Sequence, residues 1–148
     1  MQFSPRRELS FLLLLAASAA LHAQPIQATP LAPRHPLIGV WRLDIPGSPC
    51  RESYDIRPDG TMNVTSGSQA ASTVFEMSPE PSPKGFYRWT DRIVKDNGQP
   101  DCMGSIMQVG HEATNYILLD PSKRQFMLCA QEALNRCVGP FRKEGSDV

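Results

Sequence analysis

The side chains that most often carry chemistry in proteins do not stand in a catalytic pattern here. His111 precedes Glu112, but Asn115 occupies the place where the zinc-binding His-Glu-X-X-His helix needs its second histidine. Ser66-Gly67-Ser68 lacks the glycines that flank the serine in a Gly-X-Ser-X-Gly nucleophile elbow. No glycine-rich phosphate loop follows any predicted strand. We therefore predict a non-enzymatic protein with no catalytic residue, no metal site and no cofactor.

Four cysteines form the clearest chemical set. Cys50, Cys102, Cys129 and Cys137 are separated by 52, 27 and 8 residues, whereas a zinc site needs closely spaced ligand pairs, and no histidine lies near them. An even number of cysteines in an oxidising compartment indicates two disulfides, and sequence alone allows three connectivities. We favour Cys129 with Cys137, because a short helical turn over residues 131–135 would bring them together. Cys50 would then pair with Cys102.

The N-terminus has the layout of a secretory signal. Arg6 and Arg7 precede an apolar stretch from Leu9 to Leu21, and small residues follow, with cleavage expected after Ala23. The alternative is a membrane anchor, but a stretch of about 13 residues is shorter than the roughly 20 that a spanning helix needs. The first cysteine is Cys50, far from the cleavage site, so a lipoprotein is disfavoured. We expect a periplasmic or secreted protein without a membrane span after cleavage.

Length and charge limit the remaining possibilities. Removing residues 1–23 from 148 leaves 125, enough for one domain with a real core. The chain has 15 basic and 15 acidic residues, and the signal removes two arginines and one glutamate, which leaves 13 against 14. A near-neutral domain argues against nucleic acid or an anionic membrane as the partner.

The mature part alternates short β-type segments with turn residues. Residues 24–36 hold four prolines and predict an extended, mobile leader. Turns such as Pro46-Gly47, Asp59-Gly60 and Asn97-Gly98 separate the segments that follow. The predicted strands are 38–45, 51–57, 61–66, 72–77, 86–95, 104–109, 114–119, 125–130 and 138–143. This spacing favours an all-β fold, an antiparallel barrel of about eight strands over residues 37–143 or a sandwich, with a disordered tail at 144–148.

Period-two alternation predicts which side chains face the interior. Trp41 shares a face with Leu43, and the longest predicted strand turns aromatic, acidic and aliphatic side chains to one side. A carboxylate inside a barrel is costly unless it is paired or lines a wet cavity. One β-bulge would instead return these carboxylates to solvent. If the inward placement holds, the candidate ligand-binding residues are Glu52, Tyr54, Tyr87, Trp89 and Asp91.

Three segments carry a family resemblance. They are Gly39-Val40-Trp41, the hairpin that begins Tyr54-Asp-Ile-Arg-Pro-Asp-Gly-Thr, and the closing Gly139-Pro-Phe-Arg142. Together they resemble the lipocalin-type (calycin) β-barrels. The resemblance implies that Gly39 opens the barrel, that Trp41 plugs one end and that Arg142 covers the indole through a cation–π contact. It also implies a small apolar or amphipathic ligand held in the barrel.

A second, narrower resemblance concerns the export signal and the cysteine that follows the Gly-X-Trp strand within a dozen residues. This combination is similar to small periplasmic inhibitors of secreted metalloproteases, which share the barrel. It implies that residues 24–36 reach into a protease cleft. Two function classes thus stay open, a ligand-binding module and a protein-interaction module such as an inhibitor or envelope accessory protein. A cavity of about 300 Å³ or more favours the first, and a solid core with an exposed apolar patch favours the second.

Overall fold

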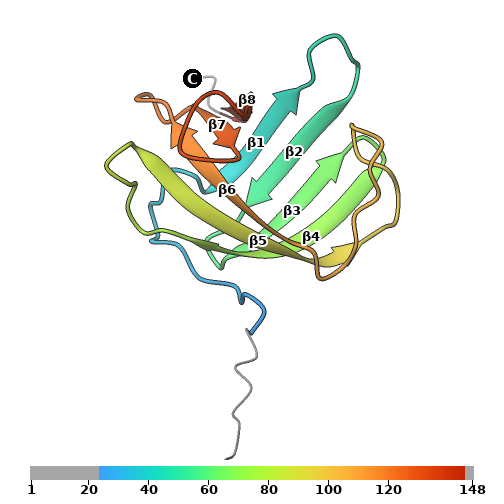
Figure 1. The fold of residues 1–148 in the computed structure, drawn as a ribbon, viewed down its shortest axis with the longest axis horizontal. Coiled ribbons are helices and arrows are strands. Elements are labelled where there is room, and N and C mark those ends of the chain that lie inside the picture. Colours follow the sequence, from blue (N-terminus) through green and yellow to red (C-terminus); the bar gives the residue numbers. More distant parts are fainter. Residues whose placement is uncertain (1–23, 146–148) are drawn as a thin grey trace, which may run out of the picture.

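The computed structural model describes residues 24–145, which form a closed barrel of eight antiparallel strands (Figure 1). Each strand pairs with the next along the chain, and β8 pairs with β1 to close the ring. The strands are β1 (Gly39–Asp44), β2 (Arg51–Ile56), β3 (Thr61–Ser66), β4 (Gln69–Met77), β5 (Phe86–Asp96), β6 (Glu112–Leu119), β7 (Gln125–Cys129) and β8 (Cys137–Lys143). The predicted all-β antiparallel barrel is confirmed. The predicted signal peptide and residues 146–148 lie outside the described residues.

The alternation of the sequence explains the inner surface. In β4, every second residue from Gln69 to Met77 is buried, and the residues between them are half-buried or exposed. The β2–β3 hairpin turns at Gly60, whose φ is +82°, and the Asp59 carboxylate accepts hydrogen bonds from the Thr61 amide and hydroxyl at 3.0 and 2.6 Å.

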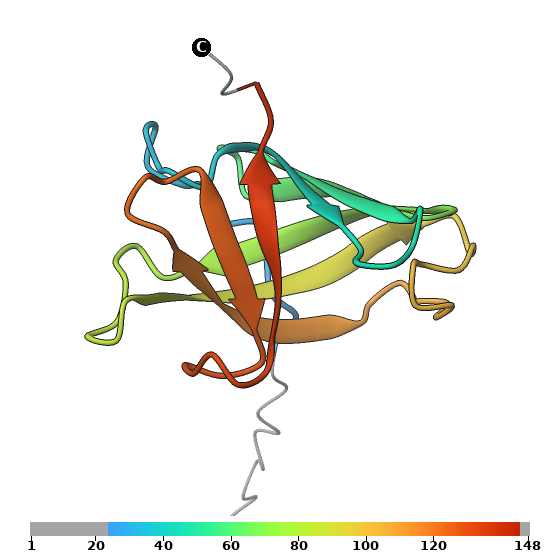
Figure 2. The same cartoon turned by 90° about the horizontal axis from the view of Figure 1, so that it is seen from above.

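The strands cross one another at an angle around the barrel. Viewed from above, β8 (red) and β7 (dark orange) run steeply across the long strands β4 and β5 (Figure 2).

The two ends of the barrel differ, and we call them the closed end and the open end. The closed end, where β1 begins, is filled by aromatic side chains. Trp41 has no exposed surface, its Nε1 donates to the Leu37 carbonyl at 2.8 Å, and its ring lies 4.8 Å from that of Phe126. Phe126 in turn stacks on Phe141 at 4.7 Å. The indole therefore fills this end of the barrel, which is where the family resemblance placed it.

The residue that covers Trp41 is Lys143, and the prediction for Arg142 was wrong. Lys143 lies opposite Trp41 in the β1–β8 register, and its Nζ is 5.2 Å from the ring centroid. The same ammonium donates to the Pro36 carbonyl at 2.9 Å, and burial lowers the pKa of Lys143. Arg142 is exposed, because adjacent residues of a strand point to opposite faces. The cationic cover is therefore one residue further along than the family resemblance implied.

This correction predicts different costs at two neighbouring positions. Lys143→Ala removes the cation–π contact and the hydrogen bond to Pro36, so the free energy of unfolding should fall by about 1 to 2 kcal/mol. Arg142→Ala should stay within about 0.5 kcal/mol of the unsubstituted protein, because its side chain is exposed. Urea denaturation of both variants measures the difference. Equal losses in the two variants would contradict the assignment of Lys143.

The segment predicted as a mobile leader lies against the closed end. Thr29 N donates to the Phe75 carbonyl at 3.0 Å, and Leu31 N donates to the Pro58 carbonyl at 2.9 Å. Gly60 permits this approach, since a Cβ there would lie 2.6 Å from the Thr29 backbone. His35 is buried, with its ring centroid 5.2 Å from that of Tyr87. These contacts correct the expectation of a leader free of the barrel.

Two further boundaries differ from the sequence predictions. Residues 104–109 form no strand but belong to a long connection over residues 97–111, the β5–β6 loop. Here the Asp101 carboxylate accepts hydrogen bonds from the Met103 and Ser105 amides at 2.9 and 2.8 Å. These two amides therefore stabilise a turn and do not form hydrogen bonds to a neighbouring strand. Glu144, which the sequence assigned to a disordered tail, donates from its backbone amide to the Val40 carbonyl at 2.8 Å.

Both disulfides lie at the open end, and both have the predicted connectivity. Cys50 pairs with Cys102, and Cys129 pairs with Cys137. The residues between the second pair form turns and bends without a helix. The first bridge ties the β5–β6 loop to the β1–β2 connection, so the loop is fixed across the open end. Within residues 24–145, no helix is long and apolar enough to cross a membrane.

Candidate functional site

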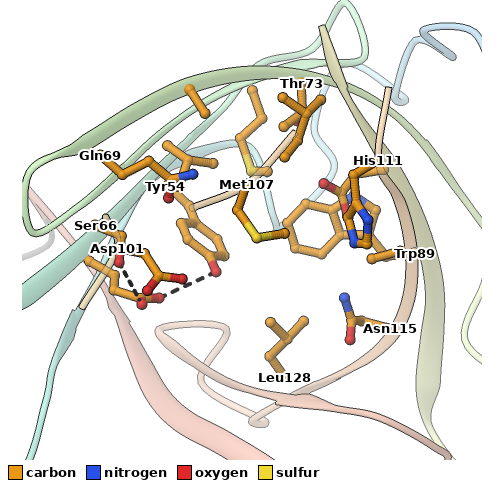
Figure 3. Close-up of a pocket in the computed structure, with 17 residues that line it drawn as sticks. Tyr54, Ser66, Gln69, Thr73, Trp89, Asp101, Met107, His111, Asn115 and Leu128 are labelled. Carbon is orange, nitrogen blue, oxygen red and sulfur yellow. Dashed lines mark hydrogen bonds between the residues drawn. The ribbon is translucent and has the colours of Figure 1, made fainter. Parts of the chain in front are cut away.

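A cavity of about 190 Å³ occupies the open half of the barrel, and we call it the barrel cavity (Figure 3). Its lining combines two aromatic rings, an aliphatic and thioether surface, and eight polar side chains. The aromatic and apolar members are Tyr54, Trp89, Met62, Val64, Ala71, Ile93, Met107, Ala113 and Leu128. The polar members are Glu52, Ser66, Gln69, Thr73, Asp91, Asp101, His111 and Asn115. This mixture is typical of small-molecule sites, although pockets for drug-sized ligands are larger.

Four of the five sequence-predicted residues line this cavity. Glu52 and Tyr54 enter from β2, and Trp89 and Asp91 enter from β5. Tyr87 does not take part, although it shares a face with Trp89. It lies two residues nearer the closed end, where the buried His35 contacts its ring. Tyr87 lines a separate pocket together with leader residues such as His35, so it does not belong to the barrel cavity.

Glu52 is held in place by hydroxyl donors. The Ser66 hydroxyl donates to its Oε1 at 2.8 Å, and the Tyr54 hydroxyl reaches its Oε2 at 3.4 Å. Ser66 itself accepts from the Cys102 amide at 3.0 Å, which connects Glu52 to the disulfide-tied loop. Burial raises the pKa of Tyr54 well above its usual value, and the nearby Glu52 carboxylate adds to the shift. Tyr54 is therefore a neutral phenol whose hydroxyl donates a hydrogen bond to the Glu52 carboxylate.

Asp91 has a different environment. No other residue between 24 and 145 donates a hydrogen bond to its carboxylate or forms an ion pair with it. Burial raises its pKa to about 6, and the nearby His111 opposes part of that shift. A hydrogen bond from its own backbone amide also opposes the shift. Burying an anionic carboxyl that has no ion pair and no donor from another residue still costs free energy at neutral pH. The site therefore holds a carboxylate that the described residues satisfy only in part.

Asp91 should make stability depend on pH. Because its folded pKa of about 6 exceeds the ordinary 3.8, its stabilising contribution is complete below about pH 4 and is lost as the pH rises through 6. Asp91→Asn has no charge to desolvate, so we expect it to raise the free energy of unfolding at pH 7.5 by up to about 3 kcal/mol. Near pH 4 the difference should vanish.

Urea denaturation at the two pH values measures this effect. Asp55→Asn is the matched control, because Asp55 lies in β2 and pairs on the exterior with Arg57 at 3.1 Å. An Asp91→Asn gain that is the same at both pH values would show that the buried charge is not its cause.

Two further polar atoms in the cavity lining lack partners within the described part of the chain. They are the Thr73 hydroxyl and the Trp89 Nε1, and both residues are buried, with 3% and 2% of their surface exposed. The β4–β5 register shifts between Ser72 and Thr73, and such bulges often re-aim side chains near sites. Buried polar groups are nearly always hydrogen-bonded in native proteins. Thr73 and Trp89 therefore each have an unused hydrogen-bonding atom among the described residues.

Sequence reasoning missed two kinds of residue. Ser66, Gln69, Thr73 and Asn115 follow the same alternation as their buried neighbours, so applying that rule along the full lengths of β3, β4 and β6 would have found them. Asp101, Met107 and His111 come from the β5–β6 loop, whose path no periodic pattern describes. Figure 3 shows Asp101 beside Ser66 on one side of the cavity, with His111 and Asn115 near Trp89 on the other.

Within residues 24–145, no group of three or more histidine, cysteine, aspartate or glutamate residues is placed to hold a metal ion. Protein-family models, curated proteins and solved structures give no match. The architecture is nevertheless consistent with a lipocalin-like barrel, since eight antiparallel strands close in consecutive order around a buried tryptophan.

Proposed function

We propose that this chain is an exported, non-enzymatic binding module of lipocalin-like type that holds a small apolar or amphipathic ligand in the barrel cavity. The observation that carries the proposal is the hollow open half of the barrel. Its lining combines the rings of Tyr54 and Trp89 with two residues, Thr73 and Trp89, that each have a polar atom without a partner in the described part of the chain. The two disulfides are consistent with an oxidising compartment such as the periplasm.

The cavity volume limits the size of the ligand. An engineered cavity of about 150 Å³ accommodates benzene, so about 190 Å³ suits a single ring with one or two substituents. A larger molecule would have to leave part of itself outside the open end. The cavity is below the volume of about 300 Å³ that would by itself favour a ligand-binding module, so the proposal rests on the composition of the lining and requires a small ligand.

A pair of adjacent alanines tests this function. Ala71 lines the cavity and is 8% exposed, whereas Ala70 is exposed on the same strand. Ala71→Phe should fill the cavity and reduce ligand occupancy at least tenfold, while Ala70→Phe should leave it within twofold. The measurement is native mass spectrometry of protein purified from the compartment to which it is exported. A co-purifying small molecule that survives Ala71→Phe, or no small molecule in the unsubstituted protein, would contradict the proposal.

A specific observation favours a second function, a protein-interaction module. Met103, Ile106 and Val109 on the β5–β6 loop are 78%, 57% and 61% exposed, although they are large and apolar. Exposed apolar clusters often mark contact surfaces. Replacing all three with serine should abolish capture of a protein partner while leaving small-molecule occupancy unchanged. The inhibitor version, in which residues 24–36 enter a protease, has less support, because part of that segment packs on the barrel.

A further inference from the structure

Three carboxylates line the barrel cavity, and none of them forms an ion pair with a lysine or arginine among the described residues. They are Glu52, Asp91 and Asp101, and no lysine or arginine among residues 24–145 lines the cavity. All five ion pairs found within residues 24–145 join other groups, such as Arg57 with Asp55 and Arg92 with Glu112. The barrel thus neutralises acidic groups on its exterior but leaves these inner ones unpaired. The single basic side chain in the lining is His111.

The three carboxylates are not equivalent. Asp101 already accepts two backbone amides of its own loop, and Glu52 accepts the hydroxyls of Ser66 and Tyr54. Asp91 receives no hydrogen bond from another residue in the described part of the chain. It is therefore the carboxylate with most capacity left for a ligand.

An independent observation points to a ligand with hydrogen-bond donors. Thr73 lines the same cavity, and its buried hydroxyl has no partner in the described residues. Thr73 pairs with Ile93, two residues along β5 from Asp91, and both Thr73 and Asp91 line the cavity. A hydroxyl oxygen and a carboxylate on neighbouring strands can accept different protons of one ammonium group. The rings of Tyr54 and Trp89, which also line the cavity, offer π faces that attract a cation.

We propose that the ligand of the barrel cavity is a small organic cation, a protonated primary amine with an apolar or aromatic body, with Asp91 and Thr73 as its main acceptors. This inference rests on the proposed ligand-binding function and names the chemical class of the ligand. The cation supplies the positive charge that no lysine or arginine of the lining provides. An anionic ligand meets three carboxylates, and a neutral one leaves Asp91 uncompensated.

Three probes of nearly equal size separate charge from shape. Benzylammonium, benzyl alcohol and benzoate share a ring that suits a cavity of about 190 Å³. By isothermal titration calorimetry at pH 7.5, benzylammonium should bind at least tenfold more tightly than benzyl alcohol, and benzoate should not bind. Asp91→Asn should weaken benzylammonium at least tenfold and change benzyl alcohol less than twofold. Asp55→Asn, which removes an exterior charge, should change neither.

The pH dependence of binding gives a second readout. Benzylammonium affinity should fall as the pH drops from 7.5 to 5, because Asp91, whose pKa is about 6, becomes protonated over this range. The other titratable groups facing the cavity are Glu52 and Tyr54 from β2 and Asp101 and His111 from the β5–β6 loop. Asp91→Asn should abolish the fall, whereas His111→Gln should preserve it.

The outcomes separate this inference from the proposed function. If benzyl alcohol binds as tightly as benzylammonium and Ala71→Phe abolishes binding of both probes, the inference of a cationic ligand is wrong and the proposed ligand-binding function stands. If none of the three probes binds at millimolar concentration, the cation is also wrong, and co-purification with the Ala71→Phe and Ala70→Phe pair still decides the function. Tight binding of benzoate would overturn the charge argument directly.

Discussion

Replacing Trp41 with alanine is expected to lower the free energy of unfolding by about 3 to 5 kcal/mol. The indole has no exposed surface and packs on Phe126, so its removal leaves a cavity among rigid aromatic rings. It also leaves the Leu37 carbonyl without its donor and Lys143 without the ring beneath it. Because natural domains are stable by only about 5 to 15 kcal/mol, the loss would remove a large part of the total. Urea denaturation measures it.

Trp41→Phe is the control for this prediction. It keeps an aromatic ring in the closed end but loses the hydrogen bond from Nε1 to Leu37, so a smaller cost of about 1 to 2 kcal/mol is expected. Val94→Ala, at a position 40% exposed, should cost less than about 0.5 kcal/mol. A Trp41→Ala loss no larger than that of Val94→Ala would refute the role of the indole as a plug.

Removing the Cys50–Cys102 disulfide is expected to cost about 4 kcal/mol. The bridge spans 52 residues of sequence, and in the chain-entropy model a loop of that length strongly restricts the unfolded state. The double variant Cys50→Ala with Cys102→Ala should also weaken ligand binding, because the bridge fixes the loop that carries Asp101, Met107 and His111. Denaturation and probe titration measure the two effects on the same sample.

The second disulfide provides the matched comparison. Cys129 and Cys137 are separated by eight residues, so the same model gives a smaller cost of about 2.5 kcal/mol. Neither cysteine lines the barrel cavity, and ligand affinity should therefore change less than twofold. Equal losses of affinity in the two double variants would mean that the β5–β6 loop does not shape the site.

Sequence alternation predicted the interior wherever a strand is regular. Trp41, Trp89 and Asp91 were placed correctly because successive side chains of a strand point to opposite faces. The same rule also shows why Lys143, and not Arg142, covers the indole. Lys143 lies two residues after the buried Phe141, so both side chains point to the same face of β8. The family pattern had specified a basic residue on the last strand, and geometry decides which one.

Other features depend on contacts between distant segments. Tyr87 has the correct parity, yet the leader packs on it, and nothing local in β5 reveals that. Residues 104–109 contain β-type side chains, but Gly104 and Gly110 have φ of +80° and +91°, and Asp101 binds nearby amides of the loop. Competing turn chemistry therefore outweighed strand propensity. The disulfide pairing was predictable only because the closely spaced cysteines favoured one choice.

The consecutive strand order has a consequence for how the barrel is completed. Each strand from β2 to β7 pairs on both edges with strands adjacent in the chain. One edge of β1 pairs with β2, but its other edge can pair only after β8, the last strand of the described residues, has folded against it. The seam between them has two register pairs, whereas β1 and β2 share six. Until the seam closes, β1 exposes an unpaired edge of the kind that promotes aggregation. In the finished molecule, hydrogen exchange should report the seam as the first part of the ring to open.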